Sequence, residues 1–276
     1  NNEAEQSSSP VASPSQSSAQ ERPQTRSTAP PSQIAPKDAM LLNESYMLVN
    51  QGQYDEAVKN FDKIIATYPT LSVAFIGRGT AYAMSRNLQP AIVDFSEAIR
   101  LQPDLMEAYK RRGQARAAAG QESEGIQDLN DALALPSMSP ADAVELTIER
   151  GLMHQKMGNY PAAVADLRSG LEGKGDSAPD GFPILNHIGL CLTSMGQISA
   201  AIDSFKACLA QRPSYKEAMV NCAQAHKELG QFETSKAYFD KAIALADNFT
   251  RAYHLRGLLH HARGEHARAA LDFEKV

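Results

Sequence analysis

The sequence predicts an all-α fold, a solenoid in which antiparallel helix pairs stack one on the next. Three observations support this prediction. Similar strings recur with a period of about 34 residues, which is typical of stacked helical repeats. A small residue recurs at one place in the first helix of each pair, and a glycine recurs between the two helices. Because all three signals keep one register, a repeat solenoid is the expected architecture.

The first element along the chain is a segment without a predicted fold. Residues 1–36 are rich in Ser, Pro and Gln and contain almost no large apolar side chains. Such a composition cannot bury enough apolar surface to offset the entropy of ordering, so we expect a disordered linker. The chain begins at Asn1 without a methionine and ends at Val276 inside an amphipathic pattern. We therefore expect it to be a piece of a longer protein.

The second element is the solenoid itself, over residues 37–276. Its repeats are expected near 38–71, 72–105, 106–139, 144–177, 182–215, 216–249 and 250–276, the last of which is cut inside its second helix. Two insertions interrupt the period, PSMSPADA after Leu135 and EGKGDSAPDGFP after Leu171. They lengthen two connections between repeats, either as tolerated surface insertions or as a partner-binding loop.

Within each pair, the small residues predict close packing of the two helices. In the first helices they are Gly79, Gly113, Gly151, Gly189, Ala223 and Gly257. In the second helices they are Ala57, Ala91, Ala163, Ala201 and Ala269, followed one turn later by Phe61, Phe95, Leu167, Phe205 and Phe273. The turns carry Gly52, Gly120, Gly158, Gly196, Gly230 and Gly264, which fits a left-handed residue that ends the first helix.

Two repeats depart from this pattern. Repeat 1 has Glu44 and Ser45 where other copies have a larger residue and glycine, as expected for a terminal repeat that acts as a cap. Repeat 3 has Gly125 at the alanine position of its second helix, and Glu122 replaces the aromatic residue of the turn. We expect this second helix to be the weakest, by about 1 kcal/mol for the glycine alone.

Four repeats carry arginine directly before the small residue of the first helix and aspartate directly before the large residue of the second. Because a guanidinium can bind a carboxylate through two parallel hydrogen bonds, we expect each arginine to pair with the aspartate of its own hairpin. The expected structural pairs are Arg78 with Asp94, Arg112 with Asp128, Arg150 with Asp166, and Arg256 with Asp272.

Composition excludes several classes of function. The formal net charge of −5 argues against a protein that mainly binds nucleic acid, because such domains carry a strongly basic face. No apolar run is long enough to span a bilayer, and no secretory signal pattern is present. Cys191, Cys208 and Cys222 lack CxxC spacing, which favours buried thiols in an intracellular protein. No catalytic motif is present, so we expect neither an enzyme nor a cofactor.

The aligned strings IGRGTAYA, KRRGQARA, IERGLMHQ and HLRGLLHH resemble the tetratricopeptide repeat (TPR) family. The resemblance implies a right-handed superhelical solenoid that binds proteins. FIGRGTAYA, AYKRRGQARAAAG and AYHLRGLLHHARGEH are further similar to plant TPR proteins that suppress effector-triggered immunity, and these resemble the TPR subunit of the yeast general transcriptional co-repressor. That similarity implies a negative regulator, nuclear and cytoplasmic, whose partners are intracellular immune receptors, signalling regulators and transcription factors.

The family's geometry implies which residues face a concave groove. The candidates are Lys110, Arg111, Gln114, Asn186, His187, Asn221, Gln224, Arg251 and His254. Arg111 either forms a salt bridge with Glu145 or Glu149 of the next repeat or binds an acidic peptide. The later amides and imidazoles are suited to bonding the backbone of an extended partner segment. Metal binding is not expected, because His260 should face the core and no carboxylate completes a ligand set.

Other classes remain as alternatives. A chaperone adaptor would need a carboxylate clamp of lysines, asparagines and arginine on three consecutive repeats. The closest late frame offers Asn186, Leu190, Asn221, Arg251 and Leu255, which lacks its central cations. A self-assembling module is the second alternative, because we expect apolar surface around Leu258, Leu259, Leu271 and Phe273 at the end of the solenoid.

Overall fold

The computed structural model describes residues 34–175 and 180–276, and every regular element in this part of the chain is a helix. The helices form seven antiparallel pairs, each followed by the next along the chain. The pairs are α1 (Pro36–Asn50) with α2 (Tyr54–Thr67), α3 (Ser72–Met84) with α4 (Leu88–Leu101), α5 (Met106–Ala118) with α6 (Glu122–Leu133), α7 (Pro140–Lys156) with α8 (Tyr160–Lys174), α9 (Phe182–Ser194) with α10 (Ile198–Gln211), α11 (Lys216–Glu228) with α12 (Phe232–Leu245), and α13 (Thr250–Ala262) with α14 (His266–Phe273). The predicted all-α solenoid is confirmed.

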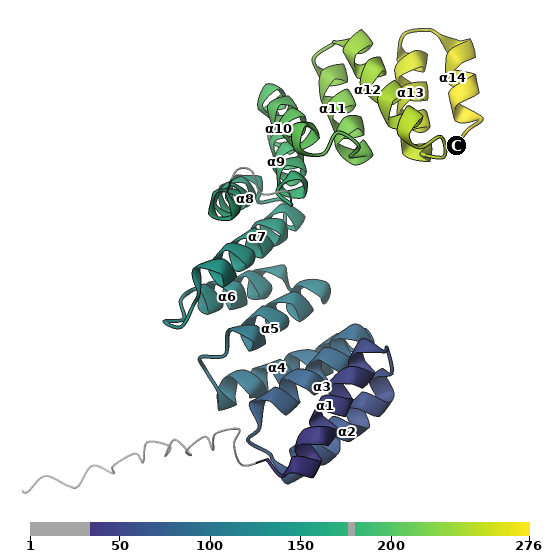
Figure 1. Cartoon of the computed structure of the whole chain (residues 1–276). Coiled ribbons are helices and arrows are strands. Elements are labelled where there is room, and N and C mark those ends of the chain that lie inside the picture. Colours follow the sequence, from purple (N-terminus) through teal and green to yellow (C-terminus); the bar gives the residue numbers. More distant parts are fainter. Residues whose placement is uncertain (1–33, 176–179) are drawn as a thin grey trace, which may run out of the picture.

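The pairs follow one another along a curved, elongated path from α1–α2 at one end to α13–α14 at the other (Figure 1). Each helix packs against its partner, and α1 to α13 also pack against a neighbouring pair. First helices also contact one another across repeats, as α1 does with α3, α3 with α5, α7 with α9, and α9 with α11. Elements on the inner side of a curved stack approach each other most closely, so the first helices line the concave side.

Seven similar turns end the first helices. In each, the amide that follows the left-handed residue donates to a carbonyl five residues back, as Gln121 N does to Arg116 O at 2.8 Å. Glycine takes the left-handed position at Gly52, Gly120, Gly158, Gly196, Gly230 and Gly264, with φ between 71° and 80°, which confirms the prediction. Arg86 occupies it in the second pair with φ of 66°. A residue with a Cβ in this conformation costs about 1 kcal/mol, so Arg86 is a strained exception.

Inside the pairs, small residues allow the large residue of the second helix to reach the first helix. A Cβ added to Gly79 would lie 2.8 Å from Phe95 Cε1, too close for a real contact. Ala91 is fully buried beside it, and Phe95 is 1% exposed. Ser45 of α1 takes the same small position. It is fully buried, and its hydroxyl donates to Leu41 O at 2.6 Å, whereas Glu44 beside it is exposed.

The first insertion, PSMSPADA, was expected to lengthen a connection between repeats. This prediction is wrong for the second half of the insertion. Helix α7 begins at Pro140, four residues before the expected start of the repeat at Val144, so the last half of PSMSPADA is helical. The reason is local. Ser139 accepts a hydrogen bond from Asp142 N at 3.1 Å, and proline follows it at the first helical position, which together cap a helix there.

Two sequence predictions fall largely or partly on residues that the structure does not describe. Almost all of the expected disordered linker lies in residues 1–33, outside the described residues, and part of the second insertion lies in 176–179, also outside them.

All three cysteines are buried and free, and burial raises the pKa of Cys191 and of Cys208 to about 11. Among the described helices, none has the length and apolar character to cross a membrane.

Candidate protein-binding groove

The early part of the concave groove is formed by α5 and α7. Lys110 Nζ lies 2.8 Å from Glu145 Oε1 and links the two helices. Arg111 was expected to make this link, but its Nε lies 2.6 Å from Glu107 in its own helix. That expectation is wrong because the pair one helical turn apart is close without any reach across the groove, which leaves Glu145 to Lys110.

Behind this pair lies a half-buried carboxyl group, that of Glu149. Burial raises its pKa, and the Gln114 amide and Lys110 ammonium oppose that effect. Gln114 itself is exposed. The early groove is therefore a set of paired charges, in which Glu145 compensates Lys110 and Glu107 compensates Arg111.

The later part of the groove contains a ladder of polar side chains from three successive first helices. Asn221 Nδ2 of α11 donates to Asn186 Oδ1 of α9 at 2.9 Å. Arg251 Nη2 of α13 donates to Asn221 Oδ1 at 2.9 Å and lies 3.5 Å from Gln224 Oε1. The two asparagines are only 5% and 6% exposed, so they bond each other and fix Arg251 at the surface.

The two groove histidines, His187 and His254, and the core histidine His260 lie in different settings. His187 Nδ1 is 2.8 Å from Gln155 Oε1 of α7, and burial lowers its pKa, so the ring is neutral near pH 7. His254 is exposed and packs against Phe273 with 6.0 Å between ring centroids. His260 is buried, and its Nδ1 lies 2.6 Å from Glu265 Oε2. In residues 34–175 and 180–276, no group of three or more His, Cys, Asp or Glu side chains is arranged to hold a metal ion.

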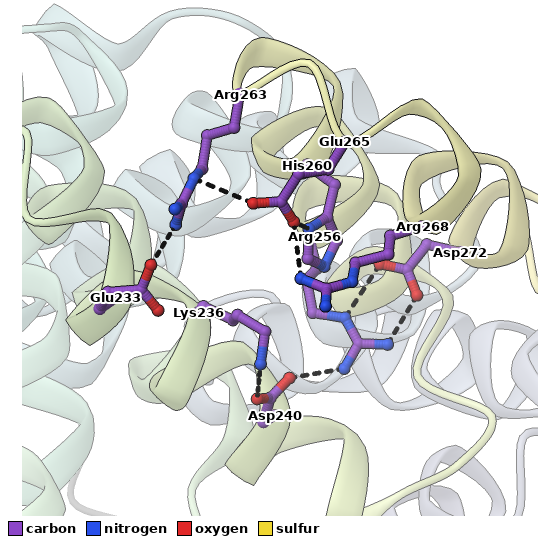
Figure 2. Close-up of polar contacts among 9 residues, drawn as sticks. All are labelled: Glu233, Lys236, Asp240, Arg256, His260, Arg263, Glu265, Arg268 and Asp272. Carbon is purple, nitrogen blue, oxygen red and sulfur yellow. Dashed lines mark hydrogen bonds and ion pairs between the residues drawn. The ribbon is translucent and has the colours of Figure 1, made fainter.

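On the side away from the groove, each of the four arginines Arg78, Arg112, Arg150 and Arg256 lies against the aspartate expected from the sequence. We call them the clamp arginines. Arg256 Nε and Nη2 donate to the two oxygens of Asp272 at 2.9 and 2.6 Å (Figure 2). Arg150 binds Asp166 in the same way, with both hydrogen bonds at 2.7 Å. Asp94 and Asp128 are 3% and 1% exposed, so these contacts are largely shielded from water.

A second partner of each clamp arginine was missed by the sequence analysis. The remaining nitrogen, Nη1, reaches the second helix of the preceding repeat. Its partners are Asp62 at 2.6 Å from Arg78, Ser96 at 3.2 Å from Arg112, Asn130 at 2.8 Å from Arg150, and Asp240 at 2.6 Å from Arg256. Each clamp arginine thus joins two successive hairpins, as Figure 2 shows for Arg256 between Asp272 and Asp240.

A sequence signal for this second partner exists. In each preceding repeat, the partner lies two residues after the position directly before the large apolar residue of the second helix. That position is occupied by Asn60, Asp94, Asp128 and Tyr238. Where the clamp arginine is replaced by Ile188 or Cys222, the corresponding partner position is Arg168 or Lys206. The partner position therefore holds a hydrogen-bond acceptor where the next repeat has the clamp arginine. It holds a cation where the next repeat lacks that arginine.

Comparisons with known proteins agree with this architecture. Tetratricopeptide repeat models match residues 39–70 and 192–259. None of the curated proteins compared with the chain matches it. A tetratricopeptide repeat protein from Parabacteroides merdae superposes with a TM-score of 0.66 at 20% identity, over 87% of this chain and 92% of that one. The C-terminal part of a TPR protein from Cytophaga hutchinsonii gives 0.67 at 16% identity, over 85% and 93%.

A third structure, YrrB, is described as a TPR protein with an unusual peptide-binding site. It superposes with a TM-score of 0.57 at 20% identity, over 71% of this chain and 97% of that one. At these identities the likeness concerns the fold. The two matched stretches are tetratricopeptide repeats, and the described chain as a whole has the fold of a TPR solenoid.

Proposed function

We propose that this protein is an interaction scaffold whose concave groove binds extended segments of other proteins. The observation that carries the proposal is the ladder on α9, α11 and α13, where buried Asn186 and Asn221 hold the exposed Arg251 in place. Repeats of this family suggest protein–protein interaction, and YrrB is described as having a peptide-binding site.

The chemistry of the later groove suits an extended segment. Such a segment presents backbone carbonyls that need donors, whatever its side chains are. The contacts of Arg251 with Asn221 and Gln224 use only Nη2, and a guanidinium has five N–H donors, so others can bind a partner. His254 is exposed on the same helix, one turn further on. The donors are pre-positioned, which lowers the entropy cost of binding.

The resemblance of FIGRGTAYA, AYKRRGQARAAAG and AYHLRGLLHHARGEH to plant immune suppressors supports a finer proposal. On this proposal the partners are intracellular immune receptors, their signalling regulators and transcription factors, and the protein acts as a negative regulator of effector-triggered immunity in the nucleus and cytoplasm. Only those sequence strings support this part of the proposal.

Affinity capture from plant extract tests both levels. The bait is the 276-residue chain, compared with a variant that carries alanine at Gln224, Arg251 and His254. These side chains are at least partly exposed, whereas Asn186 and Asn221 are buried and their replacement would disturb the packing. The matched control carries alanine at Arg100 and Arg268, whose side chains are 67% and 66% exposed on second helices.

We expect the control to capture the same proteins as the wild type, and the groove variant to lose immune receptors or transcription factors. Equal capture by all three baits would contradict the groove assignment. Capture of chaperones alone would favour an adaptor without a standard clamp, and capture of partners unrelated to immunity would remove the finer proposal while leaving the scaffold.

Self-assembly is a second candidate, favoured by the exposed apolar surface on the last pair. Leu271 is 63% exposed, and Leu258 and Phe273 are each 39% exposed, whereas Leu259, expected to join them, is 1% exposed and belongs to the core. Light scattering over a concentration range tests this candidate. A mass that grows with concentration in the wild type, and not in a Leu271→Glu variant, would support stacking of one copy on another.

A further inference from the structure

A cavity of about 330 Å³ lies in the early concave groove, between α3 and α5. Its apolar lining includes Met84, Leu88 and Phe95, and the phenyl ring forms a buried floor. Polar groups join the lining from two sides, Arg86 from the turn after α3 and Arg111 with Gln114 from α5. The cavity has the combination that binding sites for peptide side chains use, an apolar interior with a few polar groups.

Arg86 is the unusual member of this set. It is the non-glycine residue with positive φ in the described chain, at a turn position that six other repeats fill with glycine. A side chain there strains the backbone, and strain of this kind persists mainly where a site uses the residue. Glycine at this position would relieve the strain without altering the turn.

The guanidinium of Arg86 has no compensating contact within the described residues. It is exposed, and no hydrogen bond or ion pair joins it to another described residue, in contrast to the clamp arginines. Its neighbour at the cavity, Arg111, shares its charge with Glu107. Arg86 is therefore the cation at this cavity that is free to meet an anion from outside the chain.

One intramolecular role competes with binding. A positive charge just beyond a helix C-terminus interacts favourably with the helix dipole, and Arg86 follows Ser85, the C-cap residue of α3. That role does not require arginine in a left-handed backbone, because α5, α7, α11 and α13 carry their basic residues in the last turn of the helix itself and have glycine at the turn position. The dipole therefore does not account for arginine at this position, whereas the adjoining cavity does.

We propose that the cavity between α3 and α5 binds an apolar side chain of an extended peptide, and that Arg86 binds the carboxylate of an aspartate or glutamate next to it. The inference rests on the proposed scaffold function and gives the early groove a ligand class. Apolar atoms of the ligand pack on Phe95 and Met84, and the guanidinium fork receives the carboxylate through charge-assisted hydrogen bonds. Gln114 is placed to bond the peptide backbone.

The test is selection from a phage-displayed library of random nonapeptides against the 276-residue chain. We expect enriched peptides to contain an acidic residue beside Leu, Ile, Met or Phe. Synthetic versions are then titrated by fluorescence polarisation against the wild type, Arg86→Gly, Arg86→Asn and the control Arg100→Gln, which removes one exposed charge from a second helix.

We expect Arg86→Gly and Arg86→Asn to bind at least about tenfold more weakly, which is the effect of losing one charge-assisted contact, and Arg100→Gln to bind as the wild type does. Because glycine relieves the strain, the melting temperature of Arg86→Gly should equal or exceed that of the wild type. Weaker binding by a more stable variant cannot come from misfolding.

Other outcomes overturn the inference. Peptides that bind Arg86→Gly as tightly as the wild type, but lose affinity for an Arg251→Ala variant, would refute this cavity and leave the scaffold function in place. A library that yields no enriched peptide would refute the peptide ligand for this cavity. Enriched peptides without the acidic and apolar pair would refute the ligand class.

Discussion

At the scale of single residues, Arg112 illustrates how the solenoid is joined. Its Nε and Nη2 donate to Asp128 at 2.7 to 3.1 Å, and its Nη1 donates to Ser96 of the preceding pair at 3.2 Å. Arg116 adds a further contact to the same carboxylate at 2.8 Å. Asp128 is 1% exposed and carries a charge that only these guanidinium groups compensate among the described residues. Its replacement therefore affects two arginines and two helix pairs.

The first prediction concerns this pair. Asp128→Ala should lower the free energy of unfolding by about 3 kcal/mol, because it leaves shielded guanidinium groups without their carboxylate. A double-mutant cycle with Arg112→Ala should give a coupling energy of about 1–2 kcal/mol by urea denaturation. The control cycle is Arg100 with Glu97, a surface pair for which about 0.3–0.5 kcal/mol is expected. Coupling near zero in both cycles would mean that the clamp contact contributes nothing to stability.

The second prediction concerns the pH dependence caused by Glu149. Burial raises the pKa of this carboxyl above 4.5, so the folded state binds the proton more tightly than the unfolded state. Its contribution to stability therefore falls as the pH rises from 4.5 through the raised pKa, and protonation at lower pH restores it. Glu149→Gln removes this titration, so the variant should gain stability relative to the wild type across that window.

Urea denaturation at a series of pH values from about 4 to about 8 measures the difference. Glu145→Gln is the matched control, since it removes one charge next to Lys110 from an exposed position in the same helix. A Glu149→Gln difference that is constant with pH, or that declines as the pH rises, would contradict the assignment of the buried carboxyl.

At the scale of elements, the third hairpin shows that a residue can be unfavourable for a helix and still fit its packing. Gly125 of α6 faces Gly113 of α5, and a Cβ added to Gly125 would lie 2.8 Å from Gly113 O. Alanine fills this place in five of the other hairpins and Ser235 fills it in α12; Ala57, Ala91 and Ala163 are fully buried there. The backbones of α5 and α6 therefore approach each other at two glycines, and the packing leaves no room for the methyl group.

The third prediction follows from that contact. Helix propensity alone predicts that Gly125→Ala stabilises the protein by about 1 kcal/mol. Because the methyl group would overlap a backbone oxygen, we expect a loss of about 1 kcal/mol instead, measured by thermal or urea denaturation. The reverse substitution Ala163→Gly in α8 is the control and should also destabilise, since it adds only flexibility and a void. A stabilised Gly125→Ala variant would show that the hairpin can open to accept the methyl group.

The elements also indicate how far sequence reasoning reaches. The repeat register specifies where five first helices begin, because period and turn glycines are properties of the backbone; these starts are Ser72, Met106, Phe182, Lys216 and Thr250. It does not specify α7, where the local cap at Ser139 extends the helix. Nor does it specify side-chain partners in the groove. Arg111 pairs with Glu107 of its own helix and leaves Glu145 to Lys110, because such contacts differ by only a few tenths of a kcal/mol.

The burial of a side chain cannot be predicted from the repeat register either. Asn186 and Asn221 occupy groove positions, yet their burial depends on the neighbouring repeats and appears only once the helices are packed. Arg86 was missed for a similar reason. The turn pattern draws attention to glycines, and the residue that departs from the pattern becomes informative only when its φ and the cavity beside it are known.

At the scale of the whole molecule, stability depends on contacts between neighbours along one dimension. A solenoid is a sum of repeat stabilities and nearest-neighbour interfaces, so the position of a weakened interface matters as much as its strength. Arg150 joins α7 to α6 through Asn130, in the middle of the chain, and Arg256 joins α13 to α12 through Asp240, at the last pair. The two sites are alike in geometry and differ in place.

The last prediction compares the same substitution at these two positions. Arg256→Met should release only α13 and α14, so hydrogen exchange should accelerate in this pair and the main urea transition should keep its slope. Arg150→Met should separate α1–α6 from α7–α14 and broaden or split the urea transition, with a lower apparent m value, because each half then exposes its surface separately. Methionine keeps most of the aliphatic packing in both variants, so the clamp contact is the principal change. If both variants unfold in one transition of unchanged slope, the solenoid is cooperative over its whole length, and the clamp arginines do not determine where it divides.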